Sequence, residues 1–151
     1  MDRIDREKAE RVWQRVKGEA KPMPERPPAE GLPEMIAAAW TDGAEYLLLA
    51  KKLKDSPRLR HMAQQKKAQC DCLKGIYTLK TGKAPAVKAV PPEVGELAQS
   101  LRRCYGRSKK SFDRYEARST DPEYGPVFAS LALQEQEICR SLLEMLGGNG
   151  K

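Results

Sequence analysis

The chain has 151 residues, a formal net charge of +7 and only 6% aromatic residues. This length suits one domain with a single core and is short for two. Ala, Leu, Lys, Arg and Glu are abundant, which favours helices over sheets and predicts an all-α protein. The chain opens without an apolar export segment, and no window approaches the roughly 18 apolar residues of a membrane-spanning helix. We therefore expect a cytoplasmic protein that makes no membrane contact.

The first part of the chain divides into a helix and a linker. Residues 3–18 place their apolar side chains on roughly one side, which is the pattern of an amphipathic helix that docks on another surface. Residues 21–32 are rich in proline, which removes hydrogen-bond donors and restricts the preceding residues. We expect a peripheral helix within residues 1–20, a Pro-rich linker over 21–32, and the main domain over 33–147.

Two helices are predicted between Pro33 and Gly82. Pro33 suits a helix first turn, Ser56 can cap the second helix, and Pro57 can begin it. Gly82 can end this second helix. Side chains spaced by three or four residues form the predicted core-facing stripes. They are Ile36, Ala39, Gly43, Tyr46, Ala50 and Leu53 on the first helix, and Leu59, Met62, Lys66, Gln69, Leu73 and Ile76 on the second.

The segment from Gly82 to Pro92 holds three prolines and predicts an extended connection. At about 3.3 Å per residue it can span the length of a helix of about 24 residues. It can therefore run along the whole bundle and make its flanking helices parallel. Further helices are predicted over roughly 93–119 and 122–146, with Gly147 and Gly148 after them.

The two predicted helix pairs repeat each other. Shifting the sequence by 69 residues aligns the second pair with the first without a gap. The shift places Tyr46 on Tyr115, Leu59 on Phe128, Met62 on Leu131, Ala63 on Ala132, Cys70 on Cys139, and Leu73 on Leu142. A duplicated helical hairpin with a long central connection is the internal symmetry of ferritin-like bundles.

On this evidence, residues 33–146 resemble the rubrerythrin branch of the ferritin-like superfamily. In that family each repeat carries a metal-binding Glu seven residues before a Tyr, and a Glu-x-x-His on the following helix. The resemblance implies an antiparallel four-helix bundle with a long central crossover, and it implies that bundles pair as homodimers. It also raises the expectation of a di-iron centre with oxidoreductase chemistry.

The ligands of that centre are largely replaced in this chain. The six corresponding positions are Ala39, Lys66, Gln69, Ser108, Glu135 and Ile138. Only Glu135 keeps a carboxylate, and the one histidine of the chain, His61, lies one turn before the ligand level. We therefore expect no iron or other transition metal, no cofactor and no di-iron catalysis. Lys66 and Glu135 occupy symmetry-related interior positions, and we expect them to form an ion pair where the metals would lie.

Two other kinds of chemistry are open to the residues. Cys104 and Cys139 are expected at similar depth and could form a thiol pair or, with Glu135, hold a soft metal. We favour the interpretation that they fill the core as small apolar side chains. A basic stripe of Arg103, Arg107, Lys110 and Arg114 could bind nucleic acid or another acidic polymer, but a solvated face is the simpler interpretation.

The remaining aromatic residues predict packing rather than chemistry. Tyr46 and Tyr115 are expected in the core with hydrogen-bonded hydroxyls, with Glu135 as a candidate acceptor. Trp13 and Trp40 are candidates for a contact between the N-terminal helix and the bundle, or for a dimer interface. His61 is expected to be exposed. The sequence thus favours a non-catalytic binding or structural module that forms a homo-oligomer or binds a protein partner, with a ferritin-like metal or redox protein as the alternative.

Overall fold

The computed structural model describes residues 29–147. In this range the chain forms four helices and no strand: α2 (Leu32–Lys52), α3 (Pro57–Thr81), α4 (Leu97–Ala117) and α5 (Gly125–Leu146). The prediction of an all-α helical bundle is confirmed. The helix predicted over residues 3–18 and most of the Pro-rich linker lie outside the described residues. None of the described helices is both long enough and apolar enough to cross a membrane.

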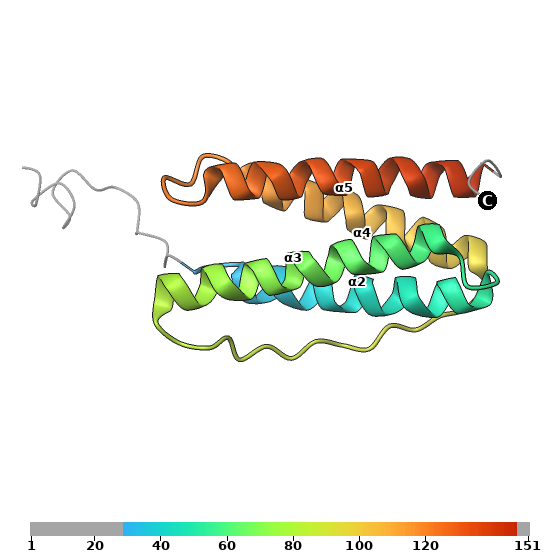
Figure 1. Ribbon diagram of the computed structural model, residues 1–151, viewed down its shortest axis with the longest axis horizontal. Helices are drawn as coiled ribbons and strands as arrows, with labels where there is room; N and C mark the ends of the chain where they lie inside the picture. Colours follow the sequence, from blue (N-terminus) through green and yellow to red (C-terminus); the bar gives the residue numbers. More distant parts are fainter. Residues whose placement is uncertain (1–28, 148–151) are drawn as a thin grey trace, which may run out of the picture. The chain divides into compact units, whose positions relative to one another are not determined.

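The helices form two antiparallel hairpins. We call α2 with α3 hairpin 1, and α4 with α5 hairpin 2; the two helices of each hairpin pack closely along each other (Figure 1). The hairpins meet through contacts of α2 with α4 and of α3 with α5. The connection over 82–96 runs along the bundle from the end of α3 to the start of α4, so that α3 and α4 are parallel (Figure 1). The predicted long crossover is confirmed.

Hairpin 1 begins and ends its second helix as the sequence predicts. The side chain of Ser56 accepts a hydrogen bond from the backbone N–H of Leu59 at 3.3 Å, and Pro57 is the first residue of α3. Gly82 ends α3 with a positive φ of 73°, a conformation that glycine adopts without steric strain. Leu53, predicted in the core stripe of α2, is instead the residue that ends this helix and is only half-buried.

The structure differs from the prediction at the start of hairpin 2. Helix α4 begins at Leu97 rather than near residue 93. The backbone carbonyls of Glu93 and Gly95 accept hydrogen bonds from the side chains of Arg103 (2.6 Å) and Lys52 (3.1 Å). These side chains come from α4 and α2, and they hold the carbonyls in the extended connection. Thr41 adds a third such bond, to the carbonyl of Val90 at 2.7 Å.

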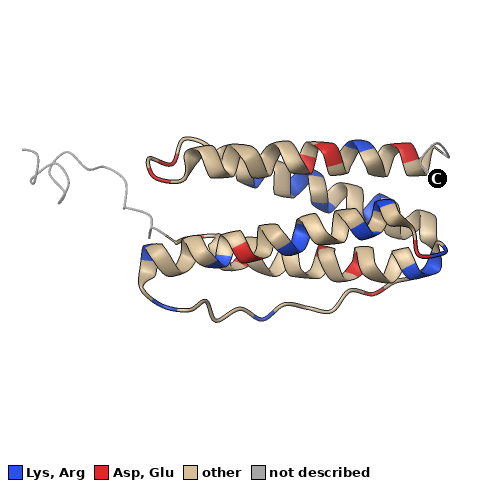
Figure 2. Ribbon diagram, in the orientation of Figure 1, with Lys and Arg blue, Asp and Glu red and all other residues tan. Residues whose placement is uncertain are grey.

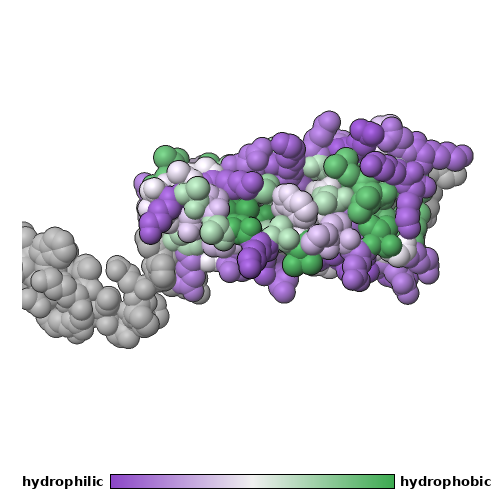
Figure 3. Space-filling model, turned by 90° about the horizontal axis from the view of Figure 1, so that it is seen from below, coloured by the Kyte–Doolittle hydropathy of each residue, from purple (hydrophilic) through white to green (hydrophobic). Residues whose placement is uncertain are grey.

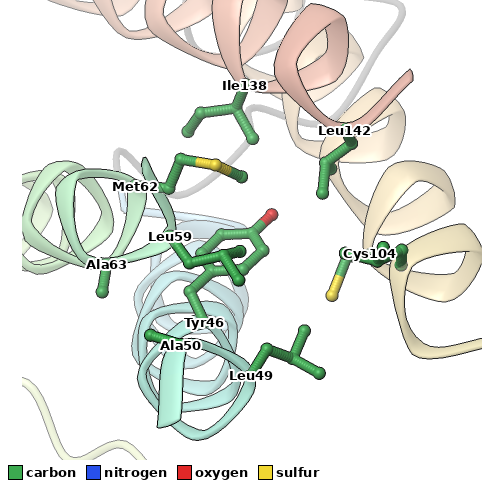
Figure 4. Packing of buried hydrophobic residues seen from close by; sticks show 10 residues of the cluster. Tyr46, Leu49, Ala50, Leu59, Met62, Ala63, Cys104, Ile138 and Leu142 are labelled. Atoms are coloured by element: carbon green, nitrogen blue, oxygen red, sulfur yellow. The ribbon is translucent and has the colours of Figure 1, made fainter. Parts of the chain in front are cut away.

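The core lies between the two hairpins and is formed from the predicted stripes. All six residues predicted for the α3 stripe are buried. Figure 4 shows one end of this core, where Tyr46, Met62, Ile138 and Leu142 come together from α2, α3 and α5. Gly43 lies where α2 approaches α3, because a Cβ atom there would be only 3.4 Å from the Cβ of Lys66. This close approach brings the polar residues of α2 next to Lys66.

Candidate functional site in the bundle interior

The six positions that correspond to the family's metal ligands all lie in the interior. Their exposed fractions are between 0 and 1%. Ala39 and Ile138 pack in the apolar core. The other four, Lys66, Gln69, Ser108 and Glu135, belong to a group of hydrogen-bonded residues that we call the central polar cluster. Its members are Asp42, Glu45, Lys66, Gln69, Arg107, Ser108, Tyr115 and Glu135.

Lys66 lies at the middle of this cluster. Its Nζ donates hydrogen bonds to Glu135 Oε2 at 2.9 Å and to Gln69 Oε1 at 3.0 Å. It also lies 3.7 Å from Asp42 Oδ2. Lys66 and Glu135 are fully buried, with 0% of either side chain exposed. The predicted ion pair between Lys66 and Glu135 is confirmed.

The polar neighbours of the Lys66–Glu135 pair form hydrogen bonds with the pair and with one another. Gln69 Nε2 donates to Glu135 Oε2 at 2.8 Å and to Gln134 Oε1 at 3.1 Å. Ser108 Oγ donates to Glu135 Oε1 at 2.9 Å, and the Tyr115 hydroxyl donates to Gln69 Oε1 at 2.9 Å. A buried charge requires such partners, because an isolated charge in the interior would lose its hydration without compensation. The cluster therefore holds the Glu135 carboxylate through donors from both hairpins.

A second group of ion pairs links α2 to α4. Arg107 Nε lies 2.7 Å from Asp42 Oδ1, and the Arg107 guanidinium also pairs with Glu45 Oε1. Arg103 reaches Glu45 Oε2 at 3.2 Å. Asp42 and Glu45 are 1% exposed, whereas the two arginines remain partly exposed. Figure 2 shows the blue segments of α3 and α4 and a red segment of α2 in the middle part of the bundle.

These pairs correct the interpretation of the basic stripe. Arg103 and Arg107 are partly exposed, as a solvated stripe would be, but their guanidinium groups also neutralise two buried carboxylates, while Lys110 is exposed. The burial of Asp42 and Glu45 is not predicted from the sequence. One signal was present, because Asp42 lies beside Gly43 and Glu45 beside Tyr46, both members of the apolar stripe of α2.

Burial and the neighbouring charges shift the pKa values of this second group in opposite directions. Burial raises the pKa of the Asp42 carboxyl, and Lys66 and Arg107 lower that pKa by less. Burial lowers the pKa of the Arg107 guanidinium, but Asp42 and Glu45 raise it by more, so the pKa lies above its ordinary value. Arg107 therefore remains a permanent cation. Asp42 Oδ2 accepts no hydrogen bond within the described part of the chain, although Lys66 lies 3.7 Å away.

The two symmetry-related tyrosines differ in their hydrogen bonds. Both rings are buried in the core, as predicted. The Tyr115 hydroxyl bonds Gln69 rather than Glu135. The Tyr46 hydroxyl has no hydrogen-bond partner among the described residues, and Figure 4 shows it pointing into a space lined by apolar side chains. The expectation that both hydroxyls are hydrogen-bonded is therefore wrong for Tyr46.

The four cysteines are free thiols, and Cys70, Cys104 and Cys139 are buried. Burial raises the pKa of the Cys104 thiol to about 12, and Glu45 adds to this rise. Burial likewise raises the pKa of the Cys70 and Cys139 thiols. Metal binding and thiol redox chemistry both use the thiolate. The surroundings of these thiols therefore oppose the chemistry of the Cys104–Cys139 alternative.

The residues of the central polar cluster do not fit a di-metal centre. Such a centre needs several carboxylates and imidazoles that converge on two cations. Here an ammonium lies against the one retained carboxylate, and Gln69 and Ser108 offer neutral groups. Within residues 29–147 no three His, Cys, Asp or Glu side chains are grouped so that they could hold a metal ion. His61 is exposed, as predicted.

A surface groove between α2 and α3 has a volume of about 420 Å³. Its α2 side is apolar and is lined by Trp40, Gly43, Ala44 and Leu47, whereas its α3 side includes Gln64, Lys67, Asp71 and Lys74. Trp40 and Leu47 are each 44% exposed. On the face seen in Figure 3, green hydrophobic areas alternate with purple hydrophilic side chains.

Comparisons of the chain with protein-family models, with curated proteins and with solved structures find no match. The resemblance to the rubrerythrin branch rests on the repeat and on the positions that it assigns.

Proposed function

We propose that the chain is a ferritin-like bundle of the rubrerythrin type whose metal centre is replaced by the central polar cluster, and that it acts as a non-catalytic binding or structural module. The observation that carries this proposal is the ion pair of Lys66 with Glu135. The Lys66 ammonium is fully buried and lies 2.9 Å from Glu135 Oε2. A side-chain cation thus neutralises the carboxylate that the family uses for a metal.

The charged groups of the cluster are paired with one another. Its carboxylates are bound to Lys66, Arg107 and Arg103, so they are occupied by permanent or hydrogen-bonded cations. Its thiol neighbour Cys104 has a pKa of about 12, which disfavours a nucleophilic thiolate. These features support a structural role for the cluster, in which it stabilises one packing of the helices, rather than a catalytic role.

Metal analysis tests this proposal. Full-length protein is purified from iron-supplemented cultures and, separately, from zinc-supplemented cultures, and its metal content is measured by mass spectrometry. We expect well under one equivalent of either metal, and no rise in the unfolding midpoint when Fe(II) or Zn(II) is added, because a ligand that binds only the folded state would raise it. One or more equivalents, or a clear metal-dependent rise, would refute the proposal.

We further propose a second copy of the chain as the partner, bound at the groove between α2 and α3. Trp40 and Leu47 supply large exposed apolar side chains on either side of Gly43 and Ala44, an arrangement in which side chains of one copy can enter the groove of the other. Sedimentation equilibrium should give dimers for the wild type and monomers for Trp40→Ser and Leu47→Ser. The control is Leu79→Ser on α3, where Leu79 is 72% exposed outside the groove. A monomeric wild type would remove this part of the proposal.

A further inference from the structure

The ion pair at the centre of the cluster lies on the symmetry axis of the repeat. Lys66 and Glu135 are 69 residues apart, which is the offset that aligns hairpin 1 with hairpin 2. In a two-fold arrangement, a residue contacts its own symmetry mate only at the axis. The 2.9 Å contact between them therefore joins equivalent positions of the two hairpins. These equivalent positions carry opposite charges.

The apolar part of the interface does not distinguish the two hairpins in this way. Tyr46 matches Tyr115, and both are fully buried. Ala63 likewise matches Ala132, and Leu73 matches Leu142, with all four side chains in the core. At other matched positions the side chains differ in size, as with Leu59 and Phe128, but both are apolar, so apolar character alone does not select hairpin 2 over another hairpin 1 as the partner of hairpin 1. A second kind of interaction must therefore select which hairpins pair.

The interior charges of the two hairpins are complementary. Hairpin 1 contributes two carboxylates, Asp42 and Glu45, and one ammonium, Lys66, so its inner face carries one net negative charge. Hairpin 2 contributes one carboxylate, Glu135, and two guanidiniums, Arg103 and Arg107, so its inner face carries one net positive charge. When hairpin 1 pairs with hairpin 2, these ionic groups neutralise one another.

We propose that these charges determine which hairpins pair, so that the inner face of hairpin 1 accepts only an α4–α5 hairpin, whether from its own chain or from a second copy. Two copies of hairpin 1 would place Lys66 against Lys66 and leave two net negative charges. Two copies of hairpin 2 would place Glu135 against Glu135 and leave two net positive charges. Like charges in a buried interface are strongly unfavourable, and such repulsion is a common means of excluding wrong partners.

Two full-length variants test this pairing rule. Lys66→Met leaves Glu135 without its cation, and Glu135→Met leaves Lys66 without its carboxylate. Each variant alone therefore folds with one unpaired buried charge. If the two chains exchange hairpins, one resulting bundle contains Lys66 with Glu135, and the other contains two methionines. Neither bundle then holds the unpaired charge, so the exchanged complex should form when the variants are refolded together.

The variants are refolded separately and as an equal mixture, and are examined by native mass spectrometry and thermal unfolding. We expect the mixture to give a complex that contains one chain of each kind, with an unfolding midpoint about 5 °C or more above that of either variant alone. The control mixture is Arg60→Met with Glu137→Met, which changes exposed residues on the same helices outside the groove. Its midpoint should equal that of its separate components, whatever dimers the surface forms.

Two results would overturn the proposal. One is a Lys66→Met variant that alone unfolds at the wild-type midpoint, since the unpaired charge would then carry no penalty. The other is a mixture whose midpoint equals those of the separate variants, whether or not the double variant Lys66→Met/Glu135→Met folds. In that case the charges would stabilise the bundle without selecting the pairing of its hairpins.

Discussion

At the scale of single residues, two buried side-chain atoms of the described interior have no hydrogen-bond partner, Asp42 Oδ2 and the Tyr46 hydroxyl. Tyr115 and Tyr46 are symmetry mates with the same burial, but only the Tyr115 hydroxyl makes a hydrogen bond. A buried hydroxyl without a partner has lost its hydration and gained nothing in return. The two tyrosines therefore match in burial and differ in whether the hydroxyl group has a hydrogen-bond partner.

This difference gives the first prediction. Tyr115→Phe should lower the free energy of unfolding by about 1 kcal/mol, the usual worth of a hydrogen bond, because Gln69 loses a donor. Tyr46→Phe should leave the stability unchanged or raise it slightly, since it removes an unpaired polar atom. Urea unfolding of both variants measures the two effects. Equal losses in both variants would show that the two hydroxyls have the same partners in solution.

The residue scale also shows what the sequence could and could not predict about the site. The pairing of Lys66 with Glu135 was predictable because the repeat places both at one interior level, and their charges are opposite. The pairing of Asp42 with Arg107 was not. It depends on how closely α2 approaches α4, and the pattern within either helix does not determine that distance. Each residue alone is compatible with a solvated surface.

At the scale of the elements, tertiary contacts decide the boundaries that the sequence left uncertain. The last helix is predicted to begin at about residue 122, yet α5 begins only at Gly125. Asp121 Oδ1 accepts hydrogen bonds at 2.8 Å from the backbone N–H groups of Glu123 and Tyr124, and Oδ2 pairs with Lys80 of α3 at 3.1 Å. These bonds hold the turn and anchor it to hairpin 1.

The second prediction concerns the pH dependence of this turn. The backbone N–H of Tyr124, together with Glu123 and Lys80, lowers the pKa of Asp121 below its ordinary value of 3.8. A lowered pKa in the folded state means that the stabilisation is present above pH 3.8 and is lost as the pH falls through the folded-state pKa. Asp121→Ala should lose about 1 kcal/mol at pH 7. In denaturant unfolding, the difference in free energy of unfolding between the wild type and Asp121→Ala should become smaller in acid. A difference that stays constant down to pH 2 would contradict a lowered pKa of Asp121 in the folded state.

A third prediction concerns Gly125, the first residue of α5. A Cβ atom there would lie 2.4 Å from the backbone oxygen of Ser119, so the turn would have to move. Gly125→Ala should therefore destabilise the protein. The matched control is Gly106→Ala on the exposed side of α4, where a Cβ atom meets nothing within 4 Å. This change should stabilise by up to about 1 kcal/mol through helix propensity. Thermal unfolding measures the change in stability of both variants. A change of the same sign in both would contradict the close contact at Gly125.

At the scale of the whole molecule, a repeated hairpin and a long crossover build a bundle whose centre is ionic. The helices, the crossover and the core stripes were predictable because proline, glycine and apolar spacing act locally. The cluster depends on how the two hairpins face each other. Removing one member of a buried ion pair leaves an uncompensated charge, whereas replacing both by apolar side chains is often nearly neutral. The free energies of unfolding of variants at Lys66 and Glu135 therefore show whether the two charges neutralise each other in the bundle interior.

The most direct test is the equilibrium unfolding of Lys66→Met, Glu135→Met and the double variant in guanidinium chloride, each measured without added metal. Each single variant should lose about 3–5 kcal/mol. The double variant should lose much less than the sum of the two, because it removes both charges together. Additive losses in the double variant would contradict the account, since Lys66 would then not be the cation that neutralises Glu135.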